Sequence, residues 1–440
     1  MRIVKIIIVM IFISKLSLMK AQEVEKMTLS ELIEIGLSSN PIVKSAENRL
    51  LIAENEYNIQ PFMPNLRGYA RTDNSTSDSK RTFRDEDSEF VGAKSNSVGA
   101  GLNFSWRLFD GLGMFAEYKR SQKGVSIQEM ETRRVVEDLV VNITTQYYLI
   151  VIQEHRVNAS KISMDLSRER FRIVQEQVNI GSASKIDLQQ ARLDFHADSS
   201  SYLKQNQLLH NSYISLNRLT NLDLRKNNYI NDSISLGNTL ILEDLELMSK
   251  DNNSEISAAR EGVYFSEASL NIARSARFPV LDFVSAYSIN RSESPASITT
   301  FNQSKGISYG FEASMNFFDG FRVSKNIKNA KIEVENRQLA LETVTLKVMS
   351  ELFSFYNDYL VNLSMIEFEQ QSMEVAKSNL DLALERYDLG LLSGIEFREF
   401  QLSYLNAVDR AMDAMFQSKV LELSLLISAG NMEDVLSRIE

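Results

Sequence analysis

The stretch Asn179–Asp187, N-I-G-S-A-S-K-I-D, interrupts a segment that otherwise reads as one continuous helix. Its glycine and small residues are typical of a sharp turn. A second stretch, Asp388–Glu396, reads D-L-G-L-L-S-G-I-E in the same kind of surroundings. Glycine ends a helix cheaply because it adopts the left-handed conformation. Both stretches, 179–187 and 388–396, are therefore predicted to be tips at which a long helix turns back.

Long helices are predicted over 112–180 and 321–389, with return helices over 186–219 and 395–427. Apolar residues recur every seven positions, a spacing typical of a coiled-coil seam. The first row is Val136, Ile143, Ile150, Val157, Met164, Phe171 and Val178. At 1.5 Å per residue, each long helix would extend roughly 105 Å. The two tips are then the far ends of two antiparallel helical hairpins.

The chain carries an internal two-fold sequence repeat with an offset of 209 residues. The turn L-F-D-G at Leu108–Gly111 returns as F-F-D-G at Phe317–Gly320, and Gly181 returns as Gly390. The distance from the D-G turn to the tip glycine is 70 residues in both halves. An identical spacing without insertions indicates that the length of the segment between the D-G turn and the tip is constrained.

Each repeat is expected to contain a helix, a β-hairpin, a long helix, a tip and a return helix. The expected boundaries are 28–221 for the first repeat, with helix 41–60 and hairpin 66–108, and 239–430 for the second, with helix 254–277 and hairpin 280–318. A linker over 222–238 joins the repeats, and 431–440 is expected to be a short C-terminal tail.

Each hairpin contains a strand with one apolar and one polar face, because apolar residues alternate with small polar ones. Residues 73–94, between the strands of the first hairpin, are expected to be a polar loop. A soluble sheet and a membrane barrel both fit the alternation. The small polar face, the aromatic residues and the length of the strands favour a barrel. The residues expected to face lipid are Val98, Leu102, Phe104, Trp106, Ile307, Tyr309, Phe311 and Met315.

The first 21 residues are predicted to be a signal peptide. Arg2 and Lys5 precede the short apolar run 6–13, which is too short to span a membrane. No later run is expected to span a membrane as a helix, so membrane contact would use strands. The mature protein is therefore expected to be exported.

Composition excludes several classes of function. A net charge of −10 argues against a nucleic-acid partner. The chain has no cysteine, so it has no disulfide framework and no thiolate metal site. Its three histidines, His155, His196 and His210, lack metal-ligand spacing. No catalytic or nucleotide-binding motif appears, so neither an enzyme activity nor a cofactor or metal is expected.

The four predicted strands of one chain cannot close a barrel, since the smallest spanning barrels have about eight strands. Open sheet edges are not tolerated in lipid, so a membrane protein of this kind must assemble. Two chains would give eight strands and three would give twelve. The strand count alone does not decide between them.

The chain resembles the outer-membrane efflux proteins, the TolC-like channel-tunnels of Gram-negative bacteria. The resemblance rests on Asn40-Pro41, on F-M-P-N-L at 62–66, and on the paired D-G turns and tips in the same order. It implies a membrane protein of mixed α and β class that forms a homotrimer. Twelve strands, four per chain, would form an outer-membrane β-barrel continued by an α-helical coiled-coil tunnel in the periplasm.

The resemblance also implies the function and its partners. The protein would be the outer-membrane exit duct of a tripartite pump, through which small molecules such as drugs leave passively. A periplasmic adaptor and an inner-membrane transporter of RND or ABC type would dock at its tips. The outer-membrane component of a type I protein secretion system is an alternative. A secreted coiled-coil adhesin or scaffold would explain the helices but not the hairpins.

The resemblance assigns two roles to tip residues. Asp187, Tyr387, Glu396 and Glu399 occupy the positions of a tip gate that selects ions, although the acids could simply complement helix N-termini. Leu392 stands where the family has a basic residue, and Lys185, Arg386 or Arg398 could replace it. The residues expected to dock the adaptor are Gly181, Ser182, Ala183, Ser184, Gly390, Leu391, Leu392 and Ser393.

Overall fold

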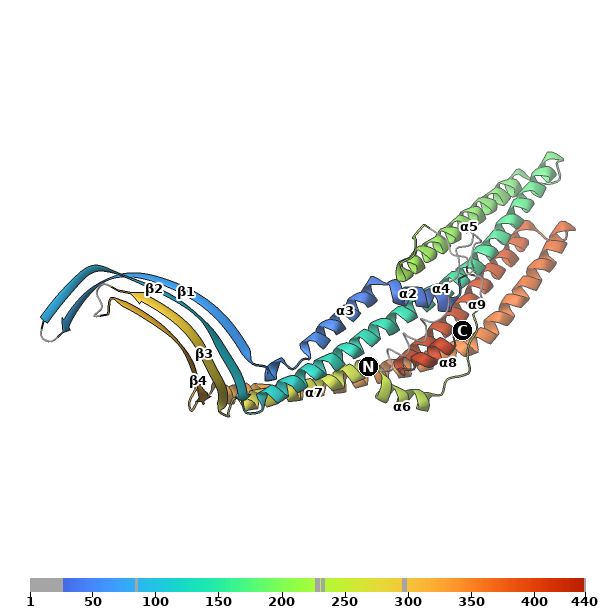
Figure 1. Cartoon of the computed structure of the whole chain (residues 1–440). Coiled ribbons are helices and arrows are strands. Elements are labelled where there is room, and N and C mark those ends of the chain that lie inside the picture. Colours follow the sequence, from blue (N-terminus) through green and yellow to red (C-terminus); the bar gives the residue numbers. More distant parts are fainter. Residues whose placement is uncertain (1–26, 84–85, 226–229, 231–233, 295–298, 439–440) are drawn as a thin grey trace, which may run out of the picture.

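The computed structural model describes residues 27–83, 86–225, 230, 234–294 and 299–438. The molecule is elongated, with a curved four-stranded sheet at one end and two helical hairpins at the other (Figure 1). The predicted signal peptide 1–21 lies outside the described residues, as does part of the predicted linker.

The first half begins with two helices, α2 (Leu29–Ser39) and α3 (Pro41–Glu56). Asn40 caps α3 by accepting a hydrogen bond from the Ile42 amide, and Pro41 takes the first helical position. Helix α3 ends before the predicted residue 60. Pro61 lacks an amide hydrogen and disfavours helix at the residue before it, so a short 3-10 turn, η1 (Gln60–Phe62), follows instead.

The sheet consists of β1 (Asn65–Phe83), β2 (Glu86–Phe109), β3 (Val280–Glu293) and β4 (Phe301–Ser314). The strands pair antiparallel in the order β1-β2-β3-β4. The prediction of a polar loop over 73–94 is wrong, because β1 and β2 continue as a two-stranded ribbon. Backbone hydrogen bonds hold that ribbon, so its side chains need not alternate. The second hairpin ends at Ser314 and not at 318, which leaves Met315 just beyond β4.

Tight turns carry the chain from the sheet into the long helices α4 (Gly113–Asn179) and α8 (Arg322–Asp388). Gly111 and Gly320 adopt positive φ there. Asp110 accepts a hydrogen bond from the Met114 amide at 3.1 Å. The corresponding Asp319 accepts one from the Val323 amide at 2.9 Å. Each long helix has 67 residues and so extends roughly 100 Å.

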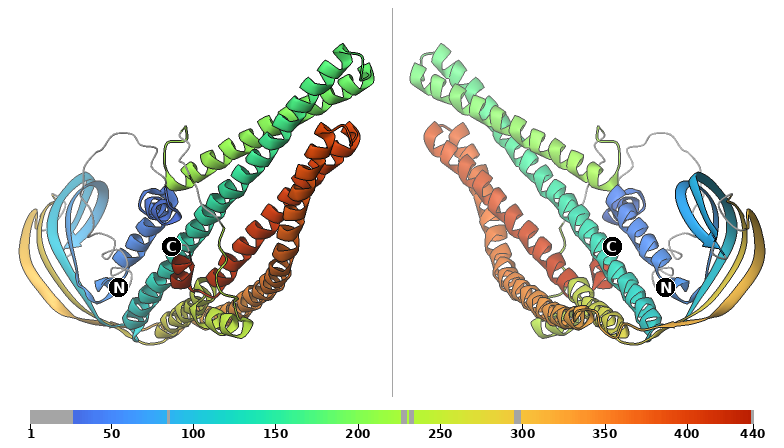
Figure 2. Two further views of the ribbon diagram at one scale, coloured as in Figure 1. Left: turned by 90° about the vertical axis from the view of Figure 1, so that its right-hand side faces the viewer. Right: turned by 90° about the vertical axis from the view of Figure 1, so that its left-hand side faces the viewer.

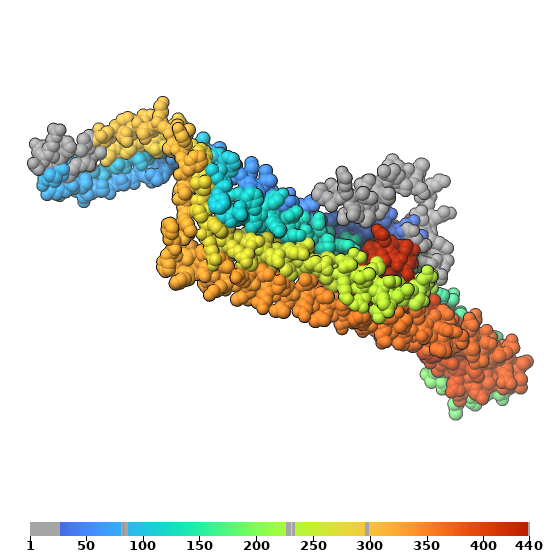
Figure 3. All heavy atoms as spheres, turned by 90° about the horizontal axis from the view of Figure 1, so that it is seen from below, coloured from blue at the N-terminus to red at the C-terminus, as the bar shows by residue number. Residues whose placement is uncertain are grey.

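The return helices are α5 (Lys185–Thr220), which packs on α4, and α9 (Gly394–Ser428), which packs on α8. Helix α7 (Ser254–Ser275) lies along α4 and α8 nearer the sheet. Both helical hairpins point the same way and end at the same end of the molecule (Figures 2 and 3).

Three short helices were not predicted. Helices α2 and α6 (Leu242–Asn252) precede α3 and α7 in corresponding places of the two halves. The C-terminal tail contains α10 (Met432–Ser437). Thr28 caps α2 in a capping box with Glu31, a local signal that the sequence carries.

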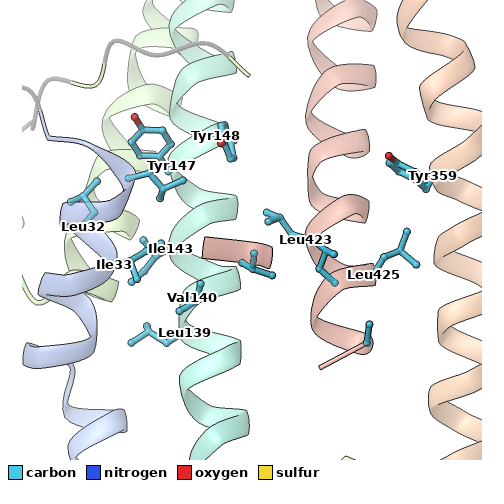
Figure 4. Close-up of a cluster of buried hydrophobic side chains, with 14 of the residues drawn as sticks. Leu32, Ile33, Leu139, Val140, Ile143, Tyr147, Tyr148, Tyr359, Leu423 and Leu425 are labelled. Carbon is cyan, nitrogen blue, oxygen red and sulfur yellow. The ribbon is translucent and has the colours of Figure 1, made fainter. Parts of the chain in front are cut away.

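The largest hydrophobic core lies where helices of both halves meet (Figure 4). Side chains seven residues apart on α4 and on α8 are fully buried there, Ile143 and Ile150 on α4 and Leu352 and Tyr359 on α8. The coiled-coil rows thus join the two hairpins at their base.

Among the described residues, one helix is long and apolar enough to cross a membrane, contrary to the expectation of no such run. It is α4, and 56% of its most apolar 18-residue stretch is buried inside the molecule. Core helices of this kind pass the same test because they are apolar for packing.

Candidate functional site: the helical tips

The first tip forms because Gly181 ends α4 with a positive φ of 80°. Its amide donates to the Val178 carbonyl at 3.0 Å, and the Ser182 amide donates to the Gln177 carbonyl at 2.8 Å. These bonds satisfy carbonyls that the end of a helix leaves open.

Helix α5 then begins with a capping box. The Asp187 amide donates to Ser184 Oγ at 3.1 Å, and the Ser184 amide donates to Asp187 Oδ2 at 3.2 Å. The hydroxyl of Ser184 also donates to Asp187 Oδ2 at 2.7 Å.

The second tip has the same construction. Gly390 has a φ of 73°, and its amide donates to the Tyr387 carbonyl at 2.9 Å. Helix α9 begins with a capping box between Ser393 and Glu396. The Ser393 amide donates to Glu396 Oε2 at 2.9 Å, and the Glu396 amide donates to Ser393 Oγ at 3.3 Å.

The capping boxes also stabilise the ionised form of two predicted gate residues. Hydrogen bonds from Ser184 lower the pKa of the Asp187 carboxyl, and those from Ser393 lower the pKa of the Glu396 carboxyl. Both side chains are therefore ionised at neutral pH. Their capping role agrees with the alternative that these acids complement helix N-termini. Glu399 lies one turn further along α9 and is exposed.

Tyr387 lies between the tip and the body of the second hairpin. Its ring stacks on Phe397 with centroids 5.1 Å apart. Burial raises the pKa of its hydroxyl, and the nearby Arg170 guanidinium lowers it by less. Phe397 is 1% exposed and forms a small cluster with Leu380 and Ala383. The Tyr387 hydroxyl is thus a neutral hydrogen-bonding group at the base of the tip.

Leu392, at the position where a basic residue was expected, packs against that same apolar cluster. Of the three proposed replacements, only Arg398 forms an ion pair within the described residues. Its guanidinium contacts both carboxylate oxygens of Asp198, at 2.6 and 2.8 Å. Arg398 lies on α9 and Asp198 on α5, so the pair joins the two hairpins of one chain. Lys185 and Arg386 are exposed.

A second buried pair lies closer to the tips. Arg170 on α4 donates to Asp194 on α5 at 2.8 Å, and the Arg170 side chain is only 5% exposed. Asp198 also accepts hydrogen bonds from Ser163 and Ser167 of α4. We call Arg170, Asp194, Asp198, Arg398, Ser163 and Ser167 the inter-hairpin clamp.

The clamp is the part of the site that sequence reasoning largely missed. Arg170 also lies close to Gly394 at the start of α9, so a side chain at residue 394 would meet its guanidinium. Arg170 therefore reaches both hairpins. The signal in the sequence that could have revealed the clamp is the pair Asp194 and Asp198, which lie four residues apart on one face of the return helix.

The profile of the outer membrane efflux protein family matches residues 32–222 and 248–430 of the chain. The chain belongs to this family. Outer membrane protein TolC of Escherichia coli strain K12 is 20% identical over 359 residues, which cover 78% of this chain and 71% of TolC. Protein CyaE of Bordetella pertussis is 20% identical over 419 residues, which cover 94% of this chain and 86% of CyaE.

Solved structures agree with the fold of this outer membrane efflux protein. The CmeC outer membrane channel of Campylobacter jejuni has a TM-score of 0.76 and 18% identity, and the match covers 97% of this chain and 98% of CmeC. The outer membrane protein VceC of Vibrio cholerae has a TM-score of 0.74 and 15% identity, covering 91% of this chain and 96% of VceC. At these identities the likeness establishes the fold.

Membership of the family places this efflux protein in the outer membrane, and the family consists of channel proteins and not enzymes. Apart from Met315, which lies beyond β4, the residues predicted to face lipid fall on one face of the sheet, since alternate residues share a face. Most are exposed, Tyr309 and Phe311 more than 70% so, and Phe104 is half-buried. Trp106 donates its ring N–H to the Phe62 carbonyl at 2.9 Å.

The residues predicted to dock an adaptor are exposed in this efflux protein, except Ala183 and Leu392, which are half-buried. Sequence reasoning named Leu391 but missed four other apolar residues of the tips. Five aliphatic side chains at the tips are 71–80% exposed: Ile180, Ile186, Leu389, Leu391 and Ile395. Exposed apolar groups clustered at one end of a protein are typical of an interaction surface.

Proposed function

We propose that this protein is the exit duct of a tripartite efflux pump, assembled from three copies. Small molecules would leave passively through a 12-stranded barrel and a helical tunnel. A periplasmic adaptor and an inner-membrane transporter of RND or ABC type would dock at the tips and supply the energy. The observation that carries this proposal is that one copy has two open sides of different construction.

One open side contains β1, α3 and α5, and the other contains β4 and α8. Within the part of the chain that the structure describes, β1 is paired only with β2, and β4 only with β3. Helices α3 and α5 pack on α4, whereas α8 packs on α7 and α9. Unpaired strand edges in lipid would leave backbone groups without partners, at a cost of several kcal/mol each.

Helix α8 supports the same conclusion over its whole length. A row of apolar side chains on α8 and its C-cap residue Leu389 is 42–74% exposed, at seven-residue spacing with one eight-residue step: Ile332, Leu339, Leu346, Phe353, Leu360, Phe368, Val375, Leu382 and Leu389. A coiled-coil row of this length needs a partner helix. We infer that the partner is the α3 and α5 side of another copy.

Contacts between two different surfaces repeat from copy to copy, and they form a ring when the rotation between copies closes. Two copies would give eight strands, and the interior of an eight-stranded barrel is filled by side chains. Three copies give twelve strands and leave a lumen, in agreement with the assembly that the family resemblance implies. A ring of three copies is therefore the assembly we propose.

The tips would act as the gate and as the docking site. Glu396 and Glu399 are three residues apart on α9 and so lie on one helix face. Three copies would bring six carboxylates towards the axis, where they attract cations. The inter-hairpin clamp holds the two tips of each copy together, which favours a narrow opening. The exposed apolar residues of the tips would contact the adaptor.

Single-channel recording in planar bilayers tests this function. The wild type should insert and show a small, cation-selective conductance, and Glu396→Gln/Glu399→Gln should reduce the selectivity. Glu374→Gln, an exposed acid on α8 further from the tip, is the matched control and should retain it. Failure of the wild type to insert, with the protein soluble and helical, would contradict the channel and favour a coiled-coil scaffold.

A second measurement separates efflux from protein secretion. A strain that lacks the gene should accumulate small toxic compounds and regain resistance when the wild-type gene is returned. If resistance is unchanged and an exported protein is instead retained in the cell, the duct serves secretion.

A further inference from the structure

The two open edges of the sheet carry opposite charges on the same face. Arg67 is opposite Asn103 on the polar face of β1 and β2. Glu312 of β4 is opposite Asp282, which is opposite Arg107, so it lies on that polar face too. Arg67 and Glu312 are both exposed, and within the described residues neither forms an ion pair.

The seam is the line along which β4 of one copy pairs with β1 of the next. The register of this pair follows from barrel closure. Followed straight across one copy, Asn65 is opposite Ser105, then Val284, then Gly310. A closed barrel needs a stagger and a strand tilt of about 35–45°. Placing Asn65 of the next copy opposite Ser314, the last residue of β4, moves the register four residues from Gly310. This pairing also brings the strand ends level.

The four-residue stagger gives an acceptable tilt. It amounts to roughly 13 Å along the strands for every four strands, which are roughly 19 Å wide. The corresponding tilt is about 35°, within the range for closed barrels. A stagger of six residues would give about 46°, and no stagger would leave the barrel unable to close.

In the four-residue register, β4 of one copy and β1 of the next place side chains of complementary charge and size opposite each other. Because the strands are antiparallel, Arg67 of the next copy is directly opposite Glu312. On the lipid-facing side, Phe311 is opposite Gly68 and Tyr309 is opposite Ala70. Large aromatic side chains on β4 thus meet small residues on β1, an arrangement that stabilises neighbouring strands.

We propose that Arg67 of one copy and Glu312 of the next form an ion pair across each seam of the barrel. The proposal rests on the ring assembly proposed above. Within one copy, Arg107 already pairs with Asp282 at 3.2 Å. The two pairs together line the lumen, near the tunnel, with equal numbers of basic and acidic groups. This belt of charged side chains carries no net charge, so ions would be selected by charge at the tips.

Disulfide cross-linking tests the register, and the absence of native cysteine removes any background. Directly opposite strand residues have Cα atoms about 4.5–5.5 Å apart, which suits a disulfide. The variant Arg67→Cys/Glu312→Cys should give covalently joined copies on mild oxidation in outer membranes. Asn65→Cys/Glu312→Cys and Tyr69→Cys/Glu312→Cys are matched controls, one pleat away, and should give few. Stronger cross-linking of either control would overturn the proposed register.

Light scattering of the same variants in detergent separates this proposal from the assembly on which it rests. Trimers without preferential 67–312 cross-linking would overturn the seam pair alone. Monomers of the wild type would contradict the ring assembly and, with it, the proposed function.

Charge exchange tests the ion pair itself. Arg67→Glu should destabilise the trimer and shift the reversal potential towards cation selectivity, because it adds negative charge to the belt. Arg67→Glu/Glu312→Arg should restore both properties. A double variant no better than Arg67→Glu would overturn the pairing, since charge complementarity would then not join the two residues.

Discussion

Asp187 and Glu396 combine a local structural role with a proposed role in the gate. Because hydrogen bonds lower the pKa of both carboxyls in the folded chain, their contribution to stability is present above the pKa of the unfolded chain. It is lost as the pH falls through the lowered folded value. The ordinary values are 3.8 for Asp and 4.5 for Glu.

The tips should therefore keep their caps from pH 7 down to pH 5 and begin to fray only below the ordinary value of 4.5 for Glu396. Ser393→Ala should increase the opening of the first turn of α9 roughly fivefold at neutral pH, because it removes the N-cap. Hydrogen exchange of that turn measures both effects. Fraying already at pH 6 would contradict the lowered pKa.

The inter-hairpin clamp gives a prediction about buried charge. Asp198→Asn should destabilise the paired hairpins by about 3 kcal/mol, because it leaves the Arg398 guanidinium buried without its counter-charge. The Arg398 side chain is 18% exposed and that of Asp198 is 5% exposed. Thermal unfolding followed by circular dichroism measures the loss. The tips should also separate, which would appear as a larger conductance.

The matched control for the clamp is Asp165→Asn. Asp165 pairs with Arg168 on the same stretch of α4, but the two side chains are 49% and 57% exposed. Exposed pairs contribute little, so a change below about 0.5 kcal/mol is expected. Equal losses in both variants would indicate a general effect of charge and not the clamp.

At the residue scale, the sequence predicted what is local and missed what is distant. The two tips were identified from their glycines and small residues because each signal lies within nine residues. Arg398 was one of three candidates for the missing basic residue. Its partner Asp198 lies 200 residues away, and no spacing rule connects the two.

At the element scale, the spacing of apolar residues predicted secondary structure correctly where one face of an element is buried or lipid-facing. The long helices and the barrel strands were predicted for that reason. It failed for the ribbon of β1 and β2 over 73–94, whose polar side chains carry no period, although backbone pairing extends to Phe83 and Glu86. Helices α2 and α6 were missed because they are only 11 residues long.

The exposed row of α8 supports a prediction about assembly. Leu346→Glu should prevent trimer formation while each chain keeps its helices, because a charge would be buried in the seam between copies. Leu346 is 65% exposed in one copy, so the folded chain itself tolerates the change. Light scattering in detergent measures the mass. Gln338→Glu on another face of α8, roughly 80° away, should still assemble.

At the scale of the whole molecule, the two helical hairpins have nearly equal lengths, and these lengths set the positions of the two tips. Helices α4 and α8 have 67 residues each, and the clamp joins the two hairpins near the tips through α5 and α9. Deleting seven residues from each arm of the α8–α9 hairpin preserves the seven-residue row. It withdraws that tip by roughly 10 Å, however, which carries Arg398 out of reach of Asp198.

Such a one-hairpin deletion should therefore raise single-channel conductance and abolish export, because the tips no longer meet or present a common docking surface. The arms can be cut where Glu369 and Arg410 join them with an ion pair of 2.9 Å. An equal deletion in α4 and α5, where Gln153 contacts Gln205, should restore the clamp and lower the conductance again. Export should return only if the adaptor reaches the shorter tunnel. If the paired deletion conducts as strongly as the single one, equal length is not what aligns the tips.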